Sequence, residues 1–507
     1  MTHLIIRPAD GLLTVTMMAG PMAAAPVSRA EVEALLPAFE AYASSTIQRW
    51  QMPGVAIGIV ADDQLVYAKG FGVRVLGGND PVDADTVFQI GSTTKAFVAT
   101  TEAILVDEGK IGWMDRVIDH DPTFRLSDPW VTREFRVIDL LAQRSGLSPY
   151  VIGEMVGLGY SADEMLAALR HEPVRGFRLT FGYQNVFHLE AARLVAAASG
   201  APSWEAFLSD RVLQPLGMLS TTATEDGILR NPNHASGHAP ADGTIRPIPL
   251  LPNFYAVGAA GNLNSSVNDM SRWLRMQING GELQGRRIVG EKALKHTRIP
   301  QIPISPIASY ASGWVVSSLQ GGRVVWHNGS TPGFGSHVGF DPERRAGIVV
   351  LTSLGGKSPP GDAIAMRFHD LLQGNPERDY GSDMLAAADA GIAAEAKAYV
   401  RPVPIIPPRP LQDYAGAYEE PALGPATVSV DGDHLVLPLG PNRMPMTVRP
   451  WSGDVFSWHL PAGDAHLAGS DPAGKVVFQT KADGSIAGFK LLFREDSAER
   501  SFTRRPS

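Results

Sequence analysis

The chain has 507 residues, of which 44% are apolar and 19% are charged, and 44 basic against 52 acidic residues give a formal net charge of −8. This composition excludes an intrinsically disordered chain, and it lacks the concentrated Lys and Arg that bind nucleic acid. The cysteine count is zero, which excludes disulfide frameworks, thiolate zinc sites and cysteine nucleophiles. Any catalysis must therefore use oxygen and nitrogen groups.

Residues 1–30 form a leader that is partly signal-like. Residues 11–25 are apolar and end in small residues, as a secretory segment does, whereas Asp10 and Pro21 depart from that pattern. A disordered leader is an equal alternative, so the sequence is compatible with an exported, periplasmic protein and with a cytoplasmic one. No segment reaches the ~18 consecutive apolar residues of a membrane span, and we expect none.

Residues 31–384 alternate between helix and strand patterns. Buried helices are predicted at 93–108 and 186–199, because each apolar run is followed by a glycine that ends it. Apolar runs typical of strands occupy 55–60, 65–68, 323–326, 337–340 and 347–352. Strands at both ends of a helical middle predict an α+β domain whose terminal segments share one sheet.

The composition changes after residue 384. Residues 385–398 are alanine-rich and predicted helical, and 399–410 contain five prolines, so 385–410 reads as a linker. Beyond it, 411–507 shows period-two runs separated by Asp-Gly turns. This pattern is the strongest short-range hairpin signal, and it predicts a small antiparallel all-β domain, either a barrel or a sandwich.

Serine is the next nucleophile to consider once thiols are excluded. The lipase-type G-x-S-x-G turn is absent, but Ser92-Thr93-Thr94-Lys95 opens the helix predicted at 93–108. Lys95 then lies one turn beyond Ser92 on the same face. A desolvated lysine has a lowered pKa and can take a serine proton. Taken alone, the same letters also fit an N-capping serine followed by a solvated lysine.

A second motif, Tyr183-Gln184-Asn185, precedes the helix predicted at 186–199. In an extended segment Tyr183 and Asn185 project to one side. A tyrosine can shuttle protons when nearby cations lower its pKa, and an asparagine can orient a substrate amide. The alternative interpretation is a helix cap, Asn185, beside a packed tyrosine.

A third motif, His327-Asn328-Gly329-Ser330, stands at the end of the strand predicted at 323–326. Glycine there would let a substrate backbone approach, and the backbone N–H of Ser330 would complete an oxyanion hole with that of Ser92. The alternative is a strand that simply runs into a turn rich in Gly and Pro. Each of the first two motifs occurs once in the chain, and the three together favour catalysis.

With these motifs the chain resembles the serine β-lactamase and penicillin-binding-protein superfamily, in its class C-like branch. Flanking segments that share the resemblance are 52–58, 141–147, 215–218, 259–273, 310–314 and 331–334. The resemblance implies Ser92 as nucleophile, Lys95 and Tyr183 as the general-base pair, and the backbone N–H groups of Ser92 and Ser330 as oxyanion hole. It implies substrate contacts from Asn185, His327, Asn328 and Gly329.

The resemblance also implies a β-lactamase/transpeptidase-like fold, in which an antiparallel sheet is flanked by helices and accompanied by a helical subdomain. It implies no metal, no organic cofactor, and a small-molecule or short-peptide substrate. Residues 411–507 are similar to the lipocalin-like domain appended to some peptidases of this family, and a homo-oligomer is compatible with the pattern. His327 replaces the lysine that helps β-lactamases bind the antibiotic's carboxylate, and a neutral histidine disfavours β-lactam turnover.

The resemblance leaves four functions open. A peptidase or amidase of the D-aminopeptidase or D-alanyl-D-alanine carboxypeptidase type ranks first, a short-chain carboxylesterase of family VIII second, and a class C-like β-lactamase third. The fourth is a non-catalytic penicillin-binding or sensor protein, because a fold alone never proves chemistry. The intact set of motifs argues against this last alternative.

Overall fold

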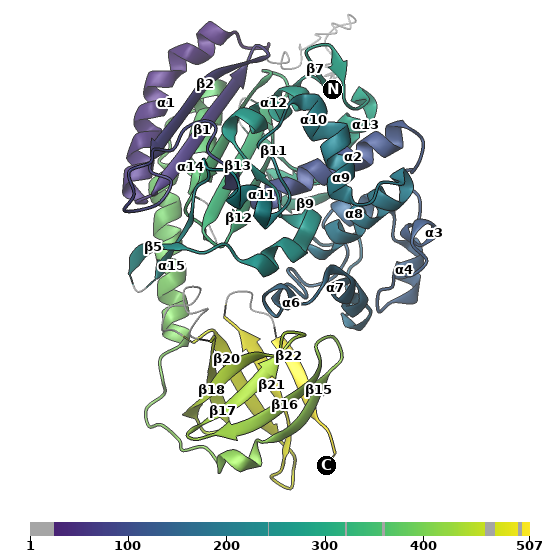
Figure 1. Ribbon diagram of the computed structural model, residues 1–507, viewed down its shortest axis with the longest axis vertical. Coiled ribbons are helices and arrows are strands. Elements are labelled where there is room, and N and C mark those ends of the chain that lie inside the picture. Colours follow the sequence, from purple (N-terminus) through teal and green to yellow (C-terminus); the bar gives the residue numbers. More distant parts are fainter. Residues whose placement is uncertain are drawn as a thin grey trace, which may run out of the picture.

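The computed structural model describes residues 25–506 apart from 242, 320–321, 357–359, 462–471 and 495–498. Residues 1–24 of the predicted leader therefore lie outside the described residues. The first element, α1 (Arg29–Arg49), begins behind Ser28, whose hydroxyl accepts a hydrogen bond from the Glu31 N–H in a capping box. Figure 1 shows a large mixed domain above a smaller barrel.

An eight-stranded antiparallel sheet forms the centre of the large domain, with strand order β2-β1-β14-β13-β12-β11-β10-β9. Its strands are β1 (Gly54–Ala61), β2 (Gln64–Gly72), β9 (Ile302–Ser305), β10 (Ala308–Tyr310), β11 (Val315–Leu319), β12 (Gly322–Thr331), β13 (Phe334–Asp341) and β14 (Ala346–Thr352). Val55 of β1 pairs with Thr352 of β14. This pairing confirms the prediction that the two ends of the domain share one sheet.

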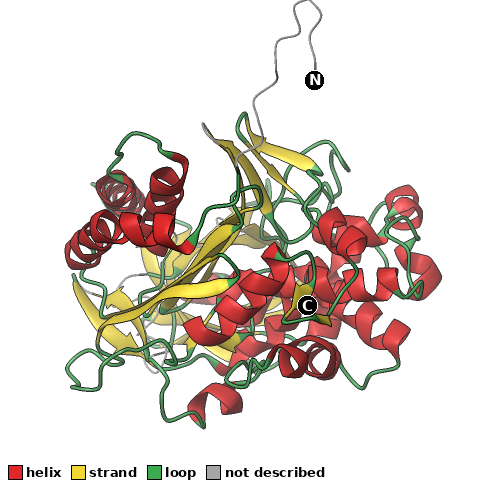
Figure 2. Cartoon of the chain, turned by 90° about the horizontal axis from the view of Figure 1, so that it is seen from above, coloured by secondary structure: helices red, strands yellow, loops and turns green. Residues whose placement is uncertain are grey.

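Helices cover both faces of the sheet, as Figure 2 shows from above. Successive strand residues point to opposite faces, so Ile57 and Ile59 pack with α1 and α14 (Gly361–Gln373), while Ala56 belongs to the core on the other side. There α12 (Val267–Ile278) lies so close to β1 that a Cβ at Gly58 would be 2.6 Å from the Val267 side chain.

The helical subdomain is built around two buried helices, α2 (Thr94–Asp107) and α8 (Val186–Ser199). Gly109 and Gly200 have φ of +70° and +75°, so each glycine takes the left-handed conformation that ends the helix before it, as predicted. The shorter helices are α3 (Val117–His120), α4 (Pro129–Glu134), α5 (Val137–Leu141), α6 (Glu154–Gly157), α7 (Ala162–Ala168), α9 (Trp204–Leu208), α10 (Gln214–Leu216), α11 (Glu225–Leu229) and α13 (Glu291–His296).

Several short elements complete the large domain. The 3₁₀ helices are η1 (Gly91–Thr93), η2 (Leu169–His171) and η4 (Pro252–Ala260), and η3 (Ser209–Leu213) is a π-helical turn. Two-stranded ladders join β3 (Phe88–Gln89) to β6 (Asn264–Ser265), β4 (Gly237–Ala241) to β5 (Thr244–Ile248), and β7 (Glu282–Leu283) to β8 (Arg286–Arg287).

The alanine-rich helix predicted at 385–398 is the later part of α15 (Tyr380–Ala398), which runs down toward the barrel in Figure 1. Residues 399–410 contain no helix or strand, and η5 (Leu411–Asp413) follows them. In the part of the chain that the structure describes, no helix is both long enough and apolar enough to cross a membrane.

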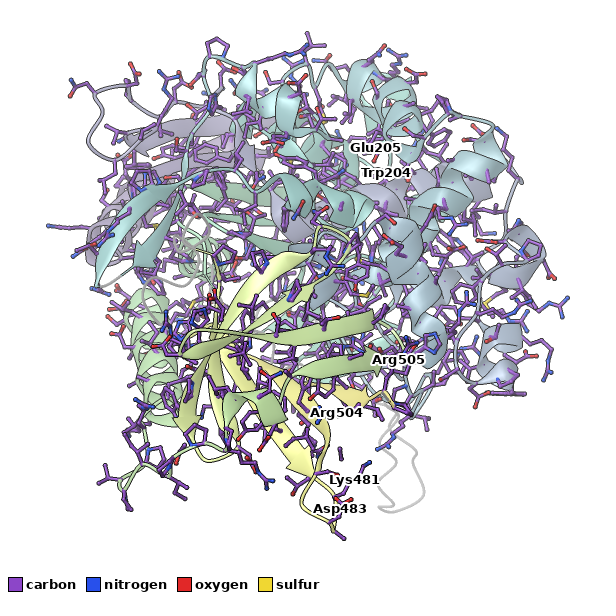
Figure 3. The ribbon with its side chains drawn as sticks, turned by 60° about the horizontal axis from the view of Figure 1, so that its bottom comes forward. Trp204, Glu205, Lys481, Asp483, Arg504 and Arg505 are labelled. Carbon is purple, nitrogen blue, oxygen red and sulfur yellow. The ribbon has the colours of Figure 1, made fainter. Side chains whose placement is uncertain are left out.

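The C-terminal domain is a closed antiparallel barrel, which decides between the barrel and the sandwich. Its strands are β15 (Gly416–Glu420), β16 (Gly424–Asp431), β17 (His434–Leu439), β18 (Met444–Ser452), β19 (Val455–His459), β20 (Gly474–Thr480), β21 (Ile486–Phe493) and β22 (Glu499–Arg504). Pairing of β15 with β22 closes it. Buried aromatic rings, among them Tyr418, Phe478 and Phe489, pack against one another inside. Figure 3 labels Lys481 and Asp483 at the predicted Asp-Gly turn between β20 and β21.

Candidate active site

Ser92 lies in η1, directly before α2, and Lys95 lies one helical turn further on. Lys95 is fully buried, and its Nζ donates hydrogen bonds to Ser92 Oγ at 2.9 Å and to the carbonyl oxygen of Ala260 at 2.7 Å. Burial lowers the pKa of the Lys95 amine well below its usual value. A neutral amine at hydrogen-bonding distance from a serine hydroxyl can accept its proton.

Tyr183 lies against the same pair. Its ring centre is 4.9 Å from Lys95 Nζ, and its phenol lies beside the Ser92 side chain. The sequence predicted a proton shuttle whose pKa nearby cations would lower, and the direction is the opposite. Burial raises the pKa of Tyr183 well above its usual value, because a buried phenolate loses its hydration. Tyr183 is therefore a protonated phenol that can pass a proton on.

A pair of glutamines holds the Tyr183 segment in place. Gln184 N–H donates to Gln143 Oε1 at 2.5 Å, and Gln143 Nε2 donates back to the Gln184 carbonyl at 3.1 Å. The Gln184 side chain, which is fully buried, donates to the carbonyl of Ser148. Gln184 thus fixes the backbone on which Tyr183 stands. Sequence reasoning missed Gln143, because a single glutamine in a loop carries no spacing signal.

Asn185 stands at the start of α8 without capping it, since its side chain makes no cap hydrogen bond. Its Oδ1 is buried and has no hydrogen-bond partner in the described part of the chain. A buried acceptor without a donor costs free energy unless a ligand supplies one. The helix-cap interpretation of Asn185 is therefore wrong, and the side chain is available to an amide N–H.

His327 on β12 is buried and neutral. Tyr310 donates its hydroxyl to His327 Nε2 at 2.9 Å, and His327 Nδ1–H donates to the carbonyl of Asn328 at 2.5 Å. Burial lowers the pKa of His327 to about 3, so the imidazole carries no charge at neutral pH. The rings of Tyr150, Tyr310 and His327 lie with their centres 5.4, 6.1 and 6.2 Å from that of Tyr183. An uncharged aromatic wall therefore surrounds the phenol.

Asn328 does not join this group. Its Nδ2 donates to Asp362 Oδ2 at 2.6 Å, and Asp362 belongs to α14 on the far face of the sheet. Neighbouring residues of a strand point to opposite faces, so a residue after the inward-facing His327 must point away from Ser92. The Asn328 side chain therefore faces away from Ser92, and a substrate contact of Asn328 stays a prediction for its backbone alone.

Gly329 and Ser330 lie against the turn that carries Ser92. A Cβ at Gly329 would be 2.1 Å from the Ile90 carbonyl and 2.8 Å from Ser92 N, and a Cβ at Gly91 would be 2.9 Å from Ser330 N. Glycine at 329 therefore makes room for the turn of Ser92 itself, whereas the sequence predicted that this room serves a substrate. The contact places the backbone of Ser330 beside that of Ser92, as the predicted oxyanion hole requires.

The edge of β12 beside this place is open. β11 pairs with β12 only from Gly322 to Trp326, whereas β13 pairs with it as far as Thr331. Among the described residues, no strand pairs with this edge of residues 327–331, which lies next to Ser92. Such an edge can bind an extended peptide through main-chain hydrogen bonds.

Comparisons with known proteins agree with this architecture. The family model described as Beta-lactamase matches residues 39–371, and the one described as Domain of unknown function (DUF3471) matches 400–504. The unguisins hydrolase ungD' of Aspergillus campestris is 28% identical over 62% of this chain and 60% of its own length. Protein flp of Staphylococcus aureus is 25% identical over 62% of both chains. This chain thus spans less than two thirds of these two curated relatives.

Two solved structures share the fold. The octameric penicillin-binding protein homologue from Pyrococcus abyssi has a TM-score of 0.61 and 24% identity, with 92% of this chain and all of that one covered. The D-amino acid amidase from Ochrobactrum anthropi has a TM-score of 0.57 and 21% identity over 67% of this chain and 99% of that one. Since the beta-lactamase model matches well over half of the sequence, the chain belongs to the beta-lactamase family.

Proposed function

We propose that this protein is a serine hydrolase that works through an acyl-enzyme on small peptide or amide substrates. The observation that carries the proposal is the fully buried amine of Lys95, with its lowered pKa, at 2.9 Å from Ser92 Oγ. A site that had lost its catalytic activity would gain nothing from a buried lysine, because desolvating an amine without a counter-charge costs stability. That cost is accounted for when the amine serves as a base.

Acylation follows from the positions of three groups. Lys95 takes the proton of Ser92 Oγ while that oxygen bonds to the substrate carbonyl carbon, and the carbonyl electron pair moves onto its oxygen. The N–H groups of Ser92 and Ser330 hold this oxyanion. The proton then passes from Lys95 through the Tyr183 phenol to the leaving nitrogen, and the C–N bond breaks. Water repeats the sequence at the ester and releases the acid.

The surroundings of Tyr183 support an amide substrate without a carboxylate at this position. The Asn185 Oδ1 acceptor lacks a donor, and an amide N–H supplies one. His327 offers no positive charge to an anion, because its pKa lies at about 3. The relatives named hydrolases and the fold shared with a D-amino acid amidase agree with this choice.

Labelling with a fluorophosphonate probe tests the nucleophile. We expect wild-type protein to be labelled at Ser92 and Ser92→Ala to remain unlabelled. Ser330→Ala is the matched control, because it removes only a hydroxyl bonded to the Gly356 carbonyl and keeps the backbone N–H. Labelling of Ser92→Ala at another serine would overturn the assignment.

The substrate class is tested by rates on D-amino acid p-nitroanilides, p-nitrophenyl butyrate and nitrocefin, measured side by side. We expect the anilides to be turned over best. Dominant ester turnover would assign an esterase instead, and dominant nitrocefin turnover a β-lactamase. A stable acyl-enzyme without turnover, seen by intact-mass spectrometry, would assign a binding protein.

The homo-oligomer stays a prediction. The solved homologue from Pyrococcus abyssi is described as octameric, and we propose that this chain also self-associates. Light scattering coupled to size-exclusion chromatography should give a mass that is a multiple of 54.3 kDa. A monomer mass at all concentrations would contradict the proposal.

A further inference from the structure

The barrel meets the large domain through a buried cluster of charges around Arg500. Burial alternates along β22, so Arg500 faces the barrel interior like Phe502 two residues later. Its guanidinium contacts the carboxylates of Glu154 and Glu172 in the large domain, and its Nη1 lies 3.8 Å from Glu420 Oε1 on β15. All four side chains are buried. This end of the barrel is thus closed by side chains of the other domain.

Neutral contacts surround the cluster. Tyr160 donates its hydroxyl to the Leu423 carbonyl at 2.6 Å. The turn between β17 and β18 lies on the same segment, so closely that a Cβ at Gly440 would be 2.1 Å from the Leu158 carbonyl. The barrel therefore covers residues 154–160, which include α6 and lead into α7 (Figure 1).

The residues directly before this segment border the candidate active site. Tyr150 N–H donates to the Tyr183 carbonyl at 2.8 Å, and the two rings lie 5.4 Å apart. Gly153 N–H donates to the Tyr150 carbonyl at 2.9 Å, and α6 with Glu154 follows at once. One tight turn thus separates the ring beside Tyr183 from the carboxylate held by Arg500.

This turn depends on its surroundings. Tyr150 and Ile152 have φ of +56° each, a left-handed conformation that costs a non-glycine residue of order 1–3 kcal/mol and persists only when neighbouring contacts hold it. The Gln184 side chain fixes one end through the Ser148 carbonyl. The Arg500–Glu154 ion pair fixes the other end.

We propose that Arg500 is a positioning residue for the substrate cleft, acting through Glu154 on Tyr150. The planar guanidinium binds two carboxylates at once in a fixed geometry, so the barrel sets the place of the Tyr150 ring. Tyr150 is 47% exposed, and its ring lies 5.4 Å from the ring of Tyr183, so its position bears on any substrate bound at Ser92. The barrel thereby takes part in recognising peptide-sized substrates. This inference rests on the proposed function for its kinetic test.

The kinetic test compares Glu154→Gln with Glu172→Gln. Both variants remove one negative charge from the same guanidinium, but only Glu154 leads directly to Tyr150. We expect Glu154→Gln to raise KM for a dipeptidyl p-nitroanilide by about fivefold, with kcat unchanged and with kcat/KM for p-nitrophenyl acetate unchanged. Glu172→Gln should leave all three unchanged. Equal rises of KM in both variants would overturn the proposal, because a merely structural interface would respond to either loss.

A second measurement does not depend on activity. Backbone amide exchange, followed by mass spectrometry, should speed up across residues 148–158 in Glu154→Gln and in Arg500→Lys, but not in Glu172→Gln. Unchanged exchange in Glu154→Gln would overturn the proposal. If the wild-type protein is not labelled at Ser92, the proposed function fails, whereas the exchange result still decides whether Arg500 positions Tyr150.

Discussion

The molecule contains two buried clusters of ionisable side chains, and the two clusters offset the cost of burying a charge in opposite ways. Around Ser92, the titratable groups Lys95, Tyr183 and His327 are each driven to the neutral form by burial. Around Arg500, a guanidinium lies among carboxylates, and its pKa is raised despite burial, because Glu154 and Glu172 stabilise its charge. The first cluster has no counter-charge and the second is built from counter-charges.

The difference separates a reactive cluster from a structural one. A neutral amine has a free electron pair and can take part in proton transfer, so the cost of burying it supports chemistry. A paired guanidinium has neither a free pair nor an exchangeable charge state, and it fixes geometry instead. The same contrast predicts opposite responses when the cation is removed from each cluster.

Lys95→Met gives the largest expected effect. The variant keeps the shape of the side chain and removes the base, so acylation of Ser92 should slow by about a thousandfold. Its free energy of unfolding should equal or exceed that of the wild type, because a desolvated amine is removed. Labelling rates and urea denaturation measure the two quantities. A large loss of stability in Lys95→Met would break the comparison.

Arg500→Met should do the reverse. It leaves buried carboxylates without their cation, and we expect a loss of about 3 kcal/mol in the free energy of unfolding. The matched control is Arg505→Met, which removes an exposed ion pair with Glu419 at the end of the barrel (Figure 3) and should cost under about 1 kcal/mol. Equal urea midpoints for the two variants would show that the Arg500 cluster contributes no more stability than an exposed ion pair.

Glu190 adds a third case to the comparison, because this buried carboxyl has the like charge of Asp121 beside it. Burial, and next the neighbouring Asp121, raise the pKa of this α8 carboxyl from 4.5 to about 8. The folded protein therefore holds a proton that the unfolded chain releases between these values. The stability that this proton confers is complete below pH 4.5 and is lost as the pH rises through 8.

Glu190→Gln should remove this pH dependence. Between pH 5 and 8.5 we expect the wild type to lose on the order of 2 kcal/mol more unfolding free energy than the variant. Asp163→Asn changes an exposed carboxylate that contributes least to raising the Glu190 pKa, and it should keep most of the wild-type slope. Parallel profiles for wild type and Glu190→Gln would contradict the assignment of the raised pKa.

His327→Lys gives the smallest expected effect. It places an ammonium group where the neutral imidazole now lies, and acylation by nitrocefin should rise about tenfold, the value of one additional charged hydrogen bond. Hydrolysis of D-amino acid p-nitroanilides should not rise. The ratio of the two rates is the measurement, and an unchanged ratio would mean that the charge at this position does not select the substrate.

Much of the architecture could be predicted from local sequence. Gly109 and Gly200 mark helix ends because only glycine takes the left-handed conformation there at no cost, and the Asp-Gly turns of the barrel follow from the same preference. The closure of the barrel could not be predicted, because it depends on pairing between β15 and β22 at opposite ends of the domain. A period-two pattern fits a sandwich equally well.

The site was predictable where spacing carries geometry and unpredictable elsewhere. Lys95 follows Ser92 by one helical turn, so their contact can be read from the sequence. The strand alternation that turns Asn328 away was equally readable, and the family resemblance overrode it. By contrast, Gln143 and Arg500 act through contacts with residues far away in the sequence, and a lone polar residue in a loop or strand carries no local signal of its partners.

The close contact between Gly329 and the turn of Ser92 also bears on biosynthesis. A ribosome completes Ser92 and α2 long before it reaches β12, which supplies the second N–H group beside the serine. During that interval the nascent chain carries the proposed nucleophile without the second N–H group of the proposed oxyanion hole. The order of residues along the chain thus completes the candidate site only when the sheet is nearly complete.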